Sequence, residues 1–594
     1  MKTAVYEKQY EQFKSGHEKL EKTFKLIGYV KLGHALFICY FIYLIFTYDG
    51  NNVPLYISGI VVLLLVGFWV RHEGIKQQLH RLKGLMEINE QHLMRITGNW
   101  TTFNDVGAEF IDYKHPFTSD LDIFGKKSLF QLLNTTKTWH GRWQFAQDLQ
   151  DAQYTDEEIL ARQAAIFELS ENVGNTNELQ YQFSKIGVHG GAKTVIGILE
   201  NEELLFQKKW EKIGLLYGPL VVVLFLAMMG ILRQPQGMMV GAGLIGVQAV
   251  IWLVNFFKVD KYLGKVAPLT YHLDSYGGVL KTLEETTFTS DLLCDIKNTL
   301  SQADVSALVG MGQLAKIMNR VSVRRNGIVM VILNALFLFD LTTAAQFGEW
   351  KKTFGPHAGN WFAQLGKLES LMALSHVSNV IHGTSFPKMT KDPILQATKL
   401  GHPLIHHQQR ITNTFSGTDE IVIISGSNMS GKTTFMRTIG INVVLGRAGT
   451  NVCAEAFTMA QFNIMTSMRI ADDLSEGIST FYAELKRIKG IIQLAHVAPR
   501  MLFLIDEIFR GTNSVDRLEG AKTVITNLND VGAMGMITTH DLEMCRLSDI
   551  HPRIINYHFS EKYVDSGIEF DYTIKTGVSM TTNAKYLMAL MDIV

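Results

Sequence analysis

One eight-residue motif constrains the fold of this chain more than any other feature of its sequence. Residues Gly426–Thr433 read GSNMSGKT and match the pattern G-x-x-x-x-G-K-[ST] at every position. An apolar run, Ile421–Ser425, comes before the motif, and a stretch with helical spacing follows it. This order predicts a strand, a loop and a helix of an α/β domain. The backbone N–H groups of such a loop and of the helix N-terminus converge on an anion, so the motif indicates a site for nucleotide phosphates.

The motif also identifies the residues that would hold the nucleotide. The Lys432 ammonium is expected to neutralise the β- and γ-phosphates of ATP, and the Thr433 hydroxyl is expected to coordinate Mg²⁺. A chance glycine-rich turn is the alternative, and the strand and helix on either side argue against it. The predicted nucleotide-binding residues are Gly426, Ser427, Asn428, Met429, Ser430, Gly431, Lys432, Thr433 and Thr434.

A second motif supplies acidic groups of the kind that ATP hydrolysis needs. The apolar residues Leu502–Ile505 lead directly into Asp506 and Glu507. Two carboxylates at the end of a buried strand are costly to hold unless they are paired or lie near a metal ion. We therefore predict that Asp506 joins the Mg²⁺ shell and that Glu507 polarises the attacking water.

A third apolar run, GMITTH, ends in His540. A histidine at the end of a strand can sense or orient the γ-phosphate, although a histidine in such a place is more often structural. Its position after the first two motifs favours the functional role. The predicted catalytic residues are therefore Lys432, Glu507 and His540, and the predicted metal ligands are Thr433 and Asp506.

The size and composition of the chain limit the other possibilities. With 594 residues, the chain is too long for one hydrophobic core, so two or more domains are expected. Lys+Arg and Asp+Glu are equal at 56 each, which gives no general attraction to nucleic acid. The four cysteines include no CxxC pair, so neither a disulfide framework nor a cysteine zinc site is expected, and a reducing compartment fits best.

Four apolar stretches predict two helical hairpins that cross a membrane. A helix needs roughly 17–25 apolar residues to cross the hydrocarbon. A very short turn joins the members of each pair, and lysines and arginines flank both pairs. The positive-inside rule then predicts a multi-pass membrane protein with both termini and the ATPase domain in the cytoplasm. Buried core helices of a soluble protein are the alternative. The predicted spans are 32–48 and 53–70 in the first hairpin, and 213–232 and 237–257 in the second.

The regions outside these stretches differ in character. Residues 72–200 and 258–390 look helical, and Thr155 with Glu158 has the pattern of a capping box at a helix start. From about Gly401, short β-rich runs alternate with helical segments. The sequence therefore predicts an N-terminal region with the first hairpin, an all-α domain that contains the second hairpin, and an α/β phosphate-loop ATPase domain of ABC type. Their predicted boundaries are 1–100, 101–400 and 401–594.

The motifs of the last third resemble those of the MutS family of DNA mismatch-repair ATPases. The resemblance covers most of 401–594, and it is specific because the motifs occur in the family's order without the LSGGQ-type signature of transporter ATPases. A weaker resemblance, over about 117–175, is to the start of the family's helical core and lever region. The motifs are GHP at Gly401–Pro403, GSNMSGKTTFMRTIG at Gly426–Gly440, RIADDLSEGISTFYAEL at Arg469–Leu485, LIDEIFRGTNSVD at Leu504–Asp516, TTHD at Thr538–Asp541 and TGVSMTTNAKYLMAL at Thr576–Leu590.

This resemblance implies a composite ATP site in a homodimer. In that family two ATPase domains form a dimer, so Ser479 and Thr480 would reach the γ-phosphate bound to the partner. Capping of a helix is the alternative role of these two residues. Asn413 and Phe415 are the candidates for contacts with the adenine base. The resemblance also implies ATP and Mg²⁺ as cofactors, DNA as a ligand, and a helical core and lever within 101–400.

The sequence departs from the family's pattern outside the ATPase region. No mismatch-reading domain with a Phe-x-Glu motif is expected, because apolar stretches stand in its place. Two functions are therefore compatible with the sequence. The first is a membrane-anchored MutS-like ATPase that couples ATP hydrolysis to DNA of mismatched or unusual structure in repair. The second is an ATP-driven membrane scaffold or transporter-like protein that acts on the lipid bilayer or on an unknown protein partner and does not bind DNA.

Overall fold

The computed structural model describes residues 2–47, 53–187, 235–266, 273–469, 480–498, 500–509, 514–564 and 567–579, together with 197, 221, 223–225 and 227. These residues form two compact units. One unit combines 1–133 with 375–594 and contains both β-sheets. The other unit is 134–374, and its described residues are helical.

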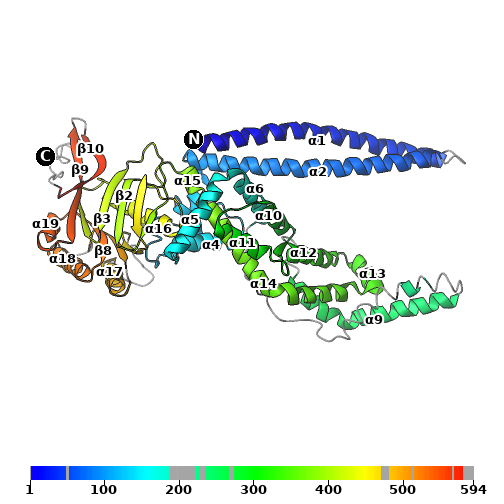
Figure 1. Cartoon of the computed structure of the whole chain (residues 1–594). Helices are drawn as coiled ribbons and strands as arrows, with labels where there is room; N and C mark the ends of the chain where they lie inside the picture. The colour runs from blue at the N-terminus through cyan, green and yellow to red at the C-terminus, as the bar shows by residue number, and fades with distance from the viewer. Residues whose placement is uncertain are drawn as a thin grey trace. The chain divides into compact units, whose positions relative to one another are not determined.

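The larger β-sheet occupies the C-terminal part of the chain (Figure 1). Its described strands lie in the order β10-β9-β4-β8-β7-β6, and all neighbours are parallel except β10, which pairs antiparallel with β9. A largely parallel sheet that is buried on both faces is typical of α/β domains. The strands are β4 (Ile421–Ser425), β6 (Asn463–Ser467), β7 (Met501–Asp506), β8 (Met534–Thr539), β9 (Ile554–Val564) and β10 (Gly567–Thr576).

Helices cover both faces of this sheet. On one face, Phe503 of β7 lies in a buried core with Ile491 of α17 and Ile525 of α18. Side chains alternate along a strand, so the neighbouring Leu504 points to the other face. There it meets α16 so closely that a Cβ added at Gly440 would lie 3.0 Å from it. The helices of this domain are α16 (Lys432–Arg447), α17 (Thr480–Val497), α18 (Ser514–Asp530), α19 (Leu542–Cys545) and α20 (Leu547–Ile550).

The strand order decides which loops meet. β8 lies between β4 and β7, with Ser425 paired to Thr539 and Asp506 paired to Thr538. Parallel strands end at the same edge of a sheet, where α/β domains bind their ligands. The loop after β4, the acidic pair at the end of β7 and His540 after β8 are therefore brought to one edge.

A smaller sheet lies beside the larger one in the same unit. Its described strands lie in the order β1-β5-β2-β3, with β2 antiparallel to both of its neighbours. Buried and exposed residues alternate along β3, as expected when one face of a strand is packed and the other is solvated. The strands are β1 (Lys388–Thr390), β2 (Ile394–Leu400), β3 (Asn413–Thr418) and β5 (Ala456–Ala460).

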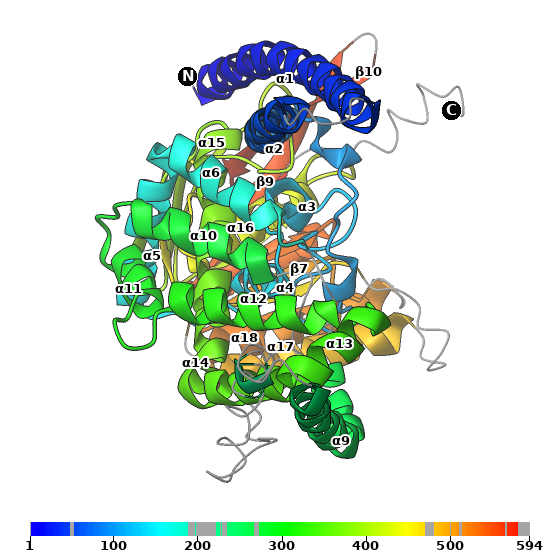
Figure 2. The same cartoon turned by 90° about the vertical axis from the view of Figure 1, so that its right-hand side faces the viewer.

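The N-terminal residues form a long helical hairpin, in which α1 (Lys2–Thr47) and α2 (Val53–Ile96) lie side by side (Figures 1 and 2). Aromatic rings pair across it along its length. Phe24 stacks on His72 with ring centroids 4.0 Å apart, and Tyr6 stacks on His92 at 4.8 Å. Short elements connect this hairpin to the sheets: η1 (Asn99–Thr102), η2 (Ala108–Phe110), α3 (Leu129–Leu133) and α15 (Val377–Val380).

The prediction of two transmembrane hairpins is wrong. Among the described residues, one helix, Met239–Val266, is long and apolar enough to cross a membrane. The helices Gly327–Phe337 and Phe339–Val380 pass the same test only as a pair, and the chain bends by 80° between them. The fold is instead a helical N-terminal half followed by mixed α/β sheets.

The physical reason lies in the helices to which the apolar stretches belong. The stretches 32–48 and 53–70 are parts of α1 and α2, which have 46 and 44 residues and carry many charged side chains over the rest of their length. The mean hydropathy of a stretch depends only on the residues within that stretch. It does not show that the helix continues beyond the stretch with many charged residues. Stretch 237–257 lies in the helix α9 (Pro235–Val266), whereas 213–232 falls almost wholly outside the described residues. The cytoplasmic placement of the termini and of the C-terminal domain stays a prediction.

Residues 134–374 form the helical unit. As predicted, Thr155 and Glu158 form a capping box, which starts α5. Asp148 of α4 is buried and accepts hydrogen bonds from Arg162 of α5 at 2.7 Å and from Ser370 of α14 at 2.6 Å, so one carboxylate joins three helices. The helices are α4 (Trp139–Gln150), α5 (Asp156–Glu171), α6 (Val173–Ser184), α9 (Pro235–Val266), α10 (Leu273–Glu285), α11 (Asp291–Leu300), α12 (Ala307–Val323), α13 (Gly327–Phe337) and α14 (Phe339–Ser375).

Candidate active site

The glycine-rich loop connects β4 to α16 and needs its glycines for steric reasons. Gly426 has φ of 147°, and an added Cβ would lie 2.8 Å from the carbonyl oxygen of Phe559. Gly431 has φ of 107°, in the left-handed region that side chains rarely adopt. Because α16 begins at Lys432, the first N–H groups of the helix face the loop and remain available to an anion.

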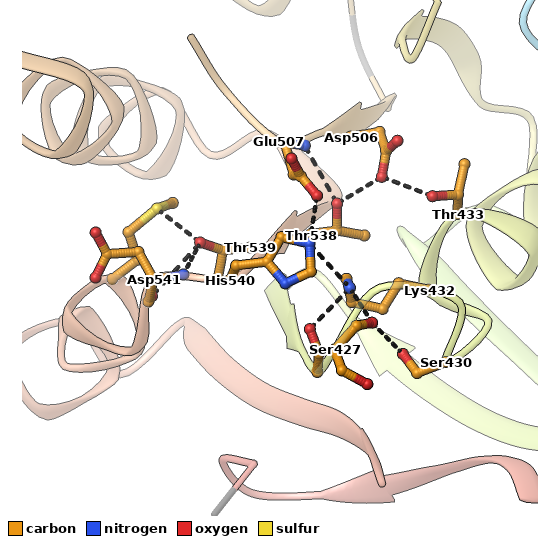
Figure 3. A network of polar contacts seen from close by, with 12 residues as sticks. Ser427, Ser430, Lys432, Thr433, Asp506, Glu507, Thr538, Thr539, His540 and Asp541 are labelled. Carbon is orange, nitrogen blue, oxygen red and sulfur yellow. Dashed lines mark hydrogen bonds and ion pairs between the residues drawn. The ribbon is translucent and has the colours of Figure 1, made fainter. Parts of the chain in front are cut away.

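The buried Lys432 side chain is hydrogen-bonded to the backbone of the loop that precedes it (Figure 3). Nζ donates hydrogen bonds to the carbonyl oxygens of Gly426 at 2.8 Å and Ser427 at 2.7 Å. It also lies 3.4 Å from Nε2 of His540. The residue that the sequence assigns to the phosphates is thus held between the loop and the end of β8.

Asp506 is the last residue of β7 and lies beside Thr433 at the start of α16. Its Oδ1 accepts a hydrogen bond from the Thr433 hydroxyl at 2.9 Å and another from the Thr538 hydroxyl at 2.7 Å. The structure therefore brings together the two predicted metal ligands, Thr433 and Asp506. A hydroxyl and a carboxylate are oxygen donors of the kind that Mg²⁺ prefers, so the pair fits that ion.

Glu507 lies next to Asp506 but faces His540. Its backbone has φ of 53°, a left-handed conformation that costs energy in a non-glycine residue and that often marks functional sites. This turn places Oε1 at 2.6 Å from Nε2 of His540, while the backbone N–H donates to the Thr538 hydroxyl at 3.2 Å. A cavity of about 60 Å³, lined in part by Glu507, His540 and Asp541, gives room for ordered water beside the carboxylate.

The other predicted nucleotide-binding residues differ in how they are placed. The buried Ser430 hydroxyl donates to the carbonyl oxygen of Ser427 at 2.8 Å and so stabilises the loop. Met429 is 83% exposed and has φ of 69° at the tip of the loop. Asn428 and Thr434 are also exposed. The roles assigned to these side chains stay predictions.

Two predicted residues of the composite site cannot be placed in the same way. Ser479 lies outside the described residues. Thr480 is the first residue of α17, and its side chain is not among those described. Their contact with a partner's nucleotide stays a prediction.

The two candidates for adenine contacts are engaged in packing. Asn413 is buried, donates to the carbonyl oxygen of Tyr572 at 3.0 Å and accepts from the N–H of Ile574 at 2.8 Å, so it joins β3 to β10. Phe415 is buried against Phe435, with ring centroids 5.9 Å apart. The structure therefore gives these two residues packing roles, and the contacts with adenine stay unassigned.

Three further residues support the site and were not predicted from the sequence. Glu561 of β9 is buried and accepts a hydrogen bond from the Ser427 hydroxyl at 2.7 Å. Thr538 bonds both members of the acidic pair through one hydroxyl. Glu484 of α17 is buried and accepts the N–H of Phe509 at 2.5 Å, which holds the turn after Glu507. Thr538 and Glu484 belong to motifs quoted from the sequence, whereas nothing in the sequence around Glu561 indicates its role.

A short acidic segment from the N-terminal half, which contains Asp120 and Asp122, makes hydrogen bonds and ion pairs with this domain. Buried Asp120 accepts hydrogen bonds from the Thr466 hydroxyl at 2.6 Å and from the N–H of Arg469 at 2.9 Å. Asp122 pairs with Arg469 at 2.6 Å and with Arg437 of α16 at 3.2 Å. Burial lowers the pKa of the Arg437 guanidinium. The helix that carries the phosphate loop and the end of β6 are thus tied to the same short acidic segment.

Comparison with known proteins locates the similarity in this domain. Residues 422–590 match the sequence model of MutS domain V. The chain is 32% identical over 184 residues to DNA mismatch repair protein MutS 2 of Halobacterium salinarum, which covers 30% of this chain and 21% of that protein. It is 27% identical over 263 residues to DNA mismatch repair protein MutS of Bacillus subtilis, covering 43% and 30%. The matched region therefore spans less than a third of the length of these relatives.

Proposed function

This chain belongs to the MutS family through its C-terminal domain, and we propose that this domain binds and hydrolyses ATP with Mg²⁺. One observation carries the proposal. The phosphate loop, the hydroxyl–carboxylate pair of Thr433 and Asp506, and the Glu507–His540 pair lie within hydrogen-bonding distance of one another at one edge of the sheet. A phosphate-binding cation, a metal-ligand pair and a candidate base are the groups that phosphoryl transfer to water requires.

The loop and Lys432 would bind and orient the triphosphate. The Lys432 ammonium already donates to carbonyl oxygens of its own loop, and phosphate oxygens would be stronger acceptors for the same N–H groups. Thr433 and Asp506 would hold Mg²⁺ between them. When bound, this ion neutralises charge on the β- and γ-phosphate oxygens.

Glu507 would act on the water. Its Oε1 can take a proton from a water molecule in the adjoining cavity as that water attacks the γ-phosphate. His540, whose Nε2 lies 2.6 Å from the same oxygen, would hold the carboxylate in place, with the Lys432 ammonium 3.4 Å from the same ring nitrogen. Thr538 would fix the positions of both acidic residues. Its hydroxyl donates a hydrogen bond to the Asp506 carboxylate and accepts one from the backbone N–H of Glu507.

The family membership supports a wider proposal about what this ATPase serves. Relatives that match the domain are named DNA mismatch repair proteins. We propose that two copies of this chain form the composite site, with Ser479 and Thr480 reaching the partner's nucleotide. ATP turnover would then be coupled to DNA of mismatched or unusual structure through the helical unit.

Steady-state phosphate release by the purified full chain tests the ATPase proposal. We expect Mg²⁺-dependent turnover, and we expect Lys432→Ala to abolish it. Lys522→Ala is the matched control, because Lys522 lies on α18, where it pairs with Glu519 one turn away. Turnover that is the same in both variants, or that is missing from the wild-type chain, would contradict the proposal.

The DNA proposal needs a separate measurement. Binding of a labelled mismatched duplex should weaken with salt along a log–log line, as phosphate contacts require. Absence of binding even at low salt would contradict the DNA proposal and would leave the ATPase proposal intact.

A further inference from the structure

The helical unit contains a large groove that the proposed ATPase does not use. Helices α12 and α13 and the first half of α14 line a cavity of about 1130 Å³, larger than the roughly 300–1,000 Å³ of common small-molecule sites. Its walls are mainly apolar. The large side chains that line it are Ile317, Leu333, Phe337, Phe339, Trp350 and Phe354.

The local packing explains why the groove is open. At one end, α12 is packed tightly on α14, where the Trp350 indole donates to the carbonyl oxygen of Gly310 at 2.6 Å. A Cβ added at Gly310 would lie 2.5 Å from the ring of Trp361. At the other end, Leu338 adopts φ of 48° and the chain bends by 80° between α13 and α14. The helices therefore meet at Gly310 and diverge toward the bend, which leaves the space between them.

Two cations stand on the α12 side of this groove. Lys316 and Arg320 are four residues apart, which places them on one face of the helix. Arg320 donates to the hydroxyls of Thr343 at 3.0 Å and Thr342 at 2.8 Å, and its guanidinium carbon lies 4.4 Å from the ring centroid of Phe339. All three of these partners are neutral.

In the described part of the chain, the positive charge on this face has no ion-pair partner. The contacts of Arg320 are with neutral groups, and burial is the cause that lowers its pKa. The acidic side chain on the lining is Glu349, which leaves a net charge of one positive unit over the three residues. A half-buried guanidinium against an apolar wall gains most from an anion that brings its own apolar surface.

We propose that this groove binds an amphipathic anion of the fatty-acid class. The carboxylate would pair with Arg320 and Lys316, for which guanidinium geometry is well suited. The alkyl chain would lie along the apolar wall formed by Leu333, Phe337 and Trp350, where its burial supplies most of the affinity. This site is separate from the nucleotide site, and the proposal stands whether or not the chain hydrolyses ATP.

A fluorescent fatty acid tests the proposal on the full-length chain. Dansyl-labelled undecanoate should bind to one saturable site with a rise in emission, and unlabelled dodecanoate below its micelle-forming concentration should displace it. Uncharged 1-dodecanol should displace it at least about tenfold less well, since it lacks the charge-assisted hydrogen bonds. Equal displacement by the acid and the alcohol would overturn the role of the two cations.

Variants of the groove separate specific binding from adsorption to other apolar surfaces. Lys316→Gln should weaken binding about fivefold, the effect of one partly solvated charge pair. Ala345→Phe should weaken it by narrowing the groove without changing charge, because Ala345 lines the cavity. Lys281→Gln, an exposed lysine on α10, should leave it unchanged. Undiminished binding by both Lys316→Gln and Ala345→Phe, or no saturable binding by the wild-type chain, would refute the site.

Discussion

The contact between Glu507 and His540 allows the chemistry of the site to be tested apart from its nucleotide binding. Replacement of Glu507 by Gln keeps the shape of the side chain but removes the anion that would accept a proton from water. A positioned general base contributes about 10²–10⁴-fold to a rate. We therefore expect kcat for ATP hydrolysis to fall by about that factor in Glu507→Gln.

Nucleotide binding should change little in the same variant. The groups expected to hold the nucleotide and the metal ion, Lys432, Thr433 and Asp506, make none of their loop and strand contacts through the Glu507 side chain, so the substitution leaves them in place. Loss of a partly exposed polar contact such as that between Glu507 and His540 is worth less than about 1 kcal/mol, so Kd for ATP should shift by less than about fivefold. Equilibrium binding of a fluorescent ATP analogue measures Kd, and single-turnover phosphate release measures the chemical step.

A double-variant cycle then tests how His540 acts. If His540 works by holding the Glu507 carboxylate at 2.6 Å, its effect must vanish when that carboxylate is gone. His540→Ala alone should slow single-turnover hydrolysis, whereas Glu507→Gln with His540→Ala should be no slower than Glu507→Gln. Additive losses would contradict this reasoning, and so would a Glu507→Gln variant that keeps more than about a tenth of the wild-type rate.

Two further predictions concern the stability of the helical unit. Asp148→Ala leaves buried Arg162 without its carboxylate and should lower the free energy of unfolding by about 3–5 kcal/mol, as measured by chemical denaturation. The control Asp151→Ala, at an exposed position, should change the free energy of unfolding by less than about 0.5 kcal/mol. Burial raises the pKa of Glu369 to about 7 despite hydrogen bonds from Thr138. The stabilising contribution of its proton is therefore full below its ordinary pKa of 4.5 and lost as the pH rises through 7. Because Gln imitates the protonated form, the free energy of unfolding of Glu369→Gln should match that of the wild-type chain at pH 4.5 and exceed it by about 3 kcal/mol at pH 8. If the two chains were equally stable at pH 8 as well, Glu369 would not carry a buried proton.

The local parts of the fold and of the site could be predicted from sequence because their determinants are local. The run Ile421–Ser425 and the glycines after it specify a strand and a loop within a few residues, and Thr155 with Glu158 specifies a helix start. The acidic pair at the end of a buried strand is informative because charge in such a place needs a partner. These features depend on neighbours in the chain, and the structure contains each of them.

The remaining parts depend on contacts between distant residues. Glu561 supports Ser427 only because β9 pairs with β4, and no motif marks that pairing. Asn413 was a candidate for the nucleotide because it precedes the loop, yet its amide joins β3 to β10. The transmembrane hairpins were predicted from windows of composition, whereas the structure shows helices that continue far beyond those windows. Sequence patterns therefore predict the reactive groups at the edge of the larger sheet better than they predict the helices and strands that hold those groups in place.

The most direct test of the central claim is the structure of the Glu507→Gln chain determined with ATP and Mg²⁺. We expect the triphosphate against the loop, with Lys432 turned from the carbonyl oxygens of Gly426 and Ser427 to the β- and γ-phosphates. We also expect a metal ion beside Thr433 and Asp506. A nucleotide bound elsewhere on the chain, or a metal ion that contacts neither of these two residues, would contradict this claim.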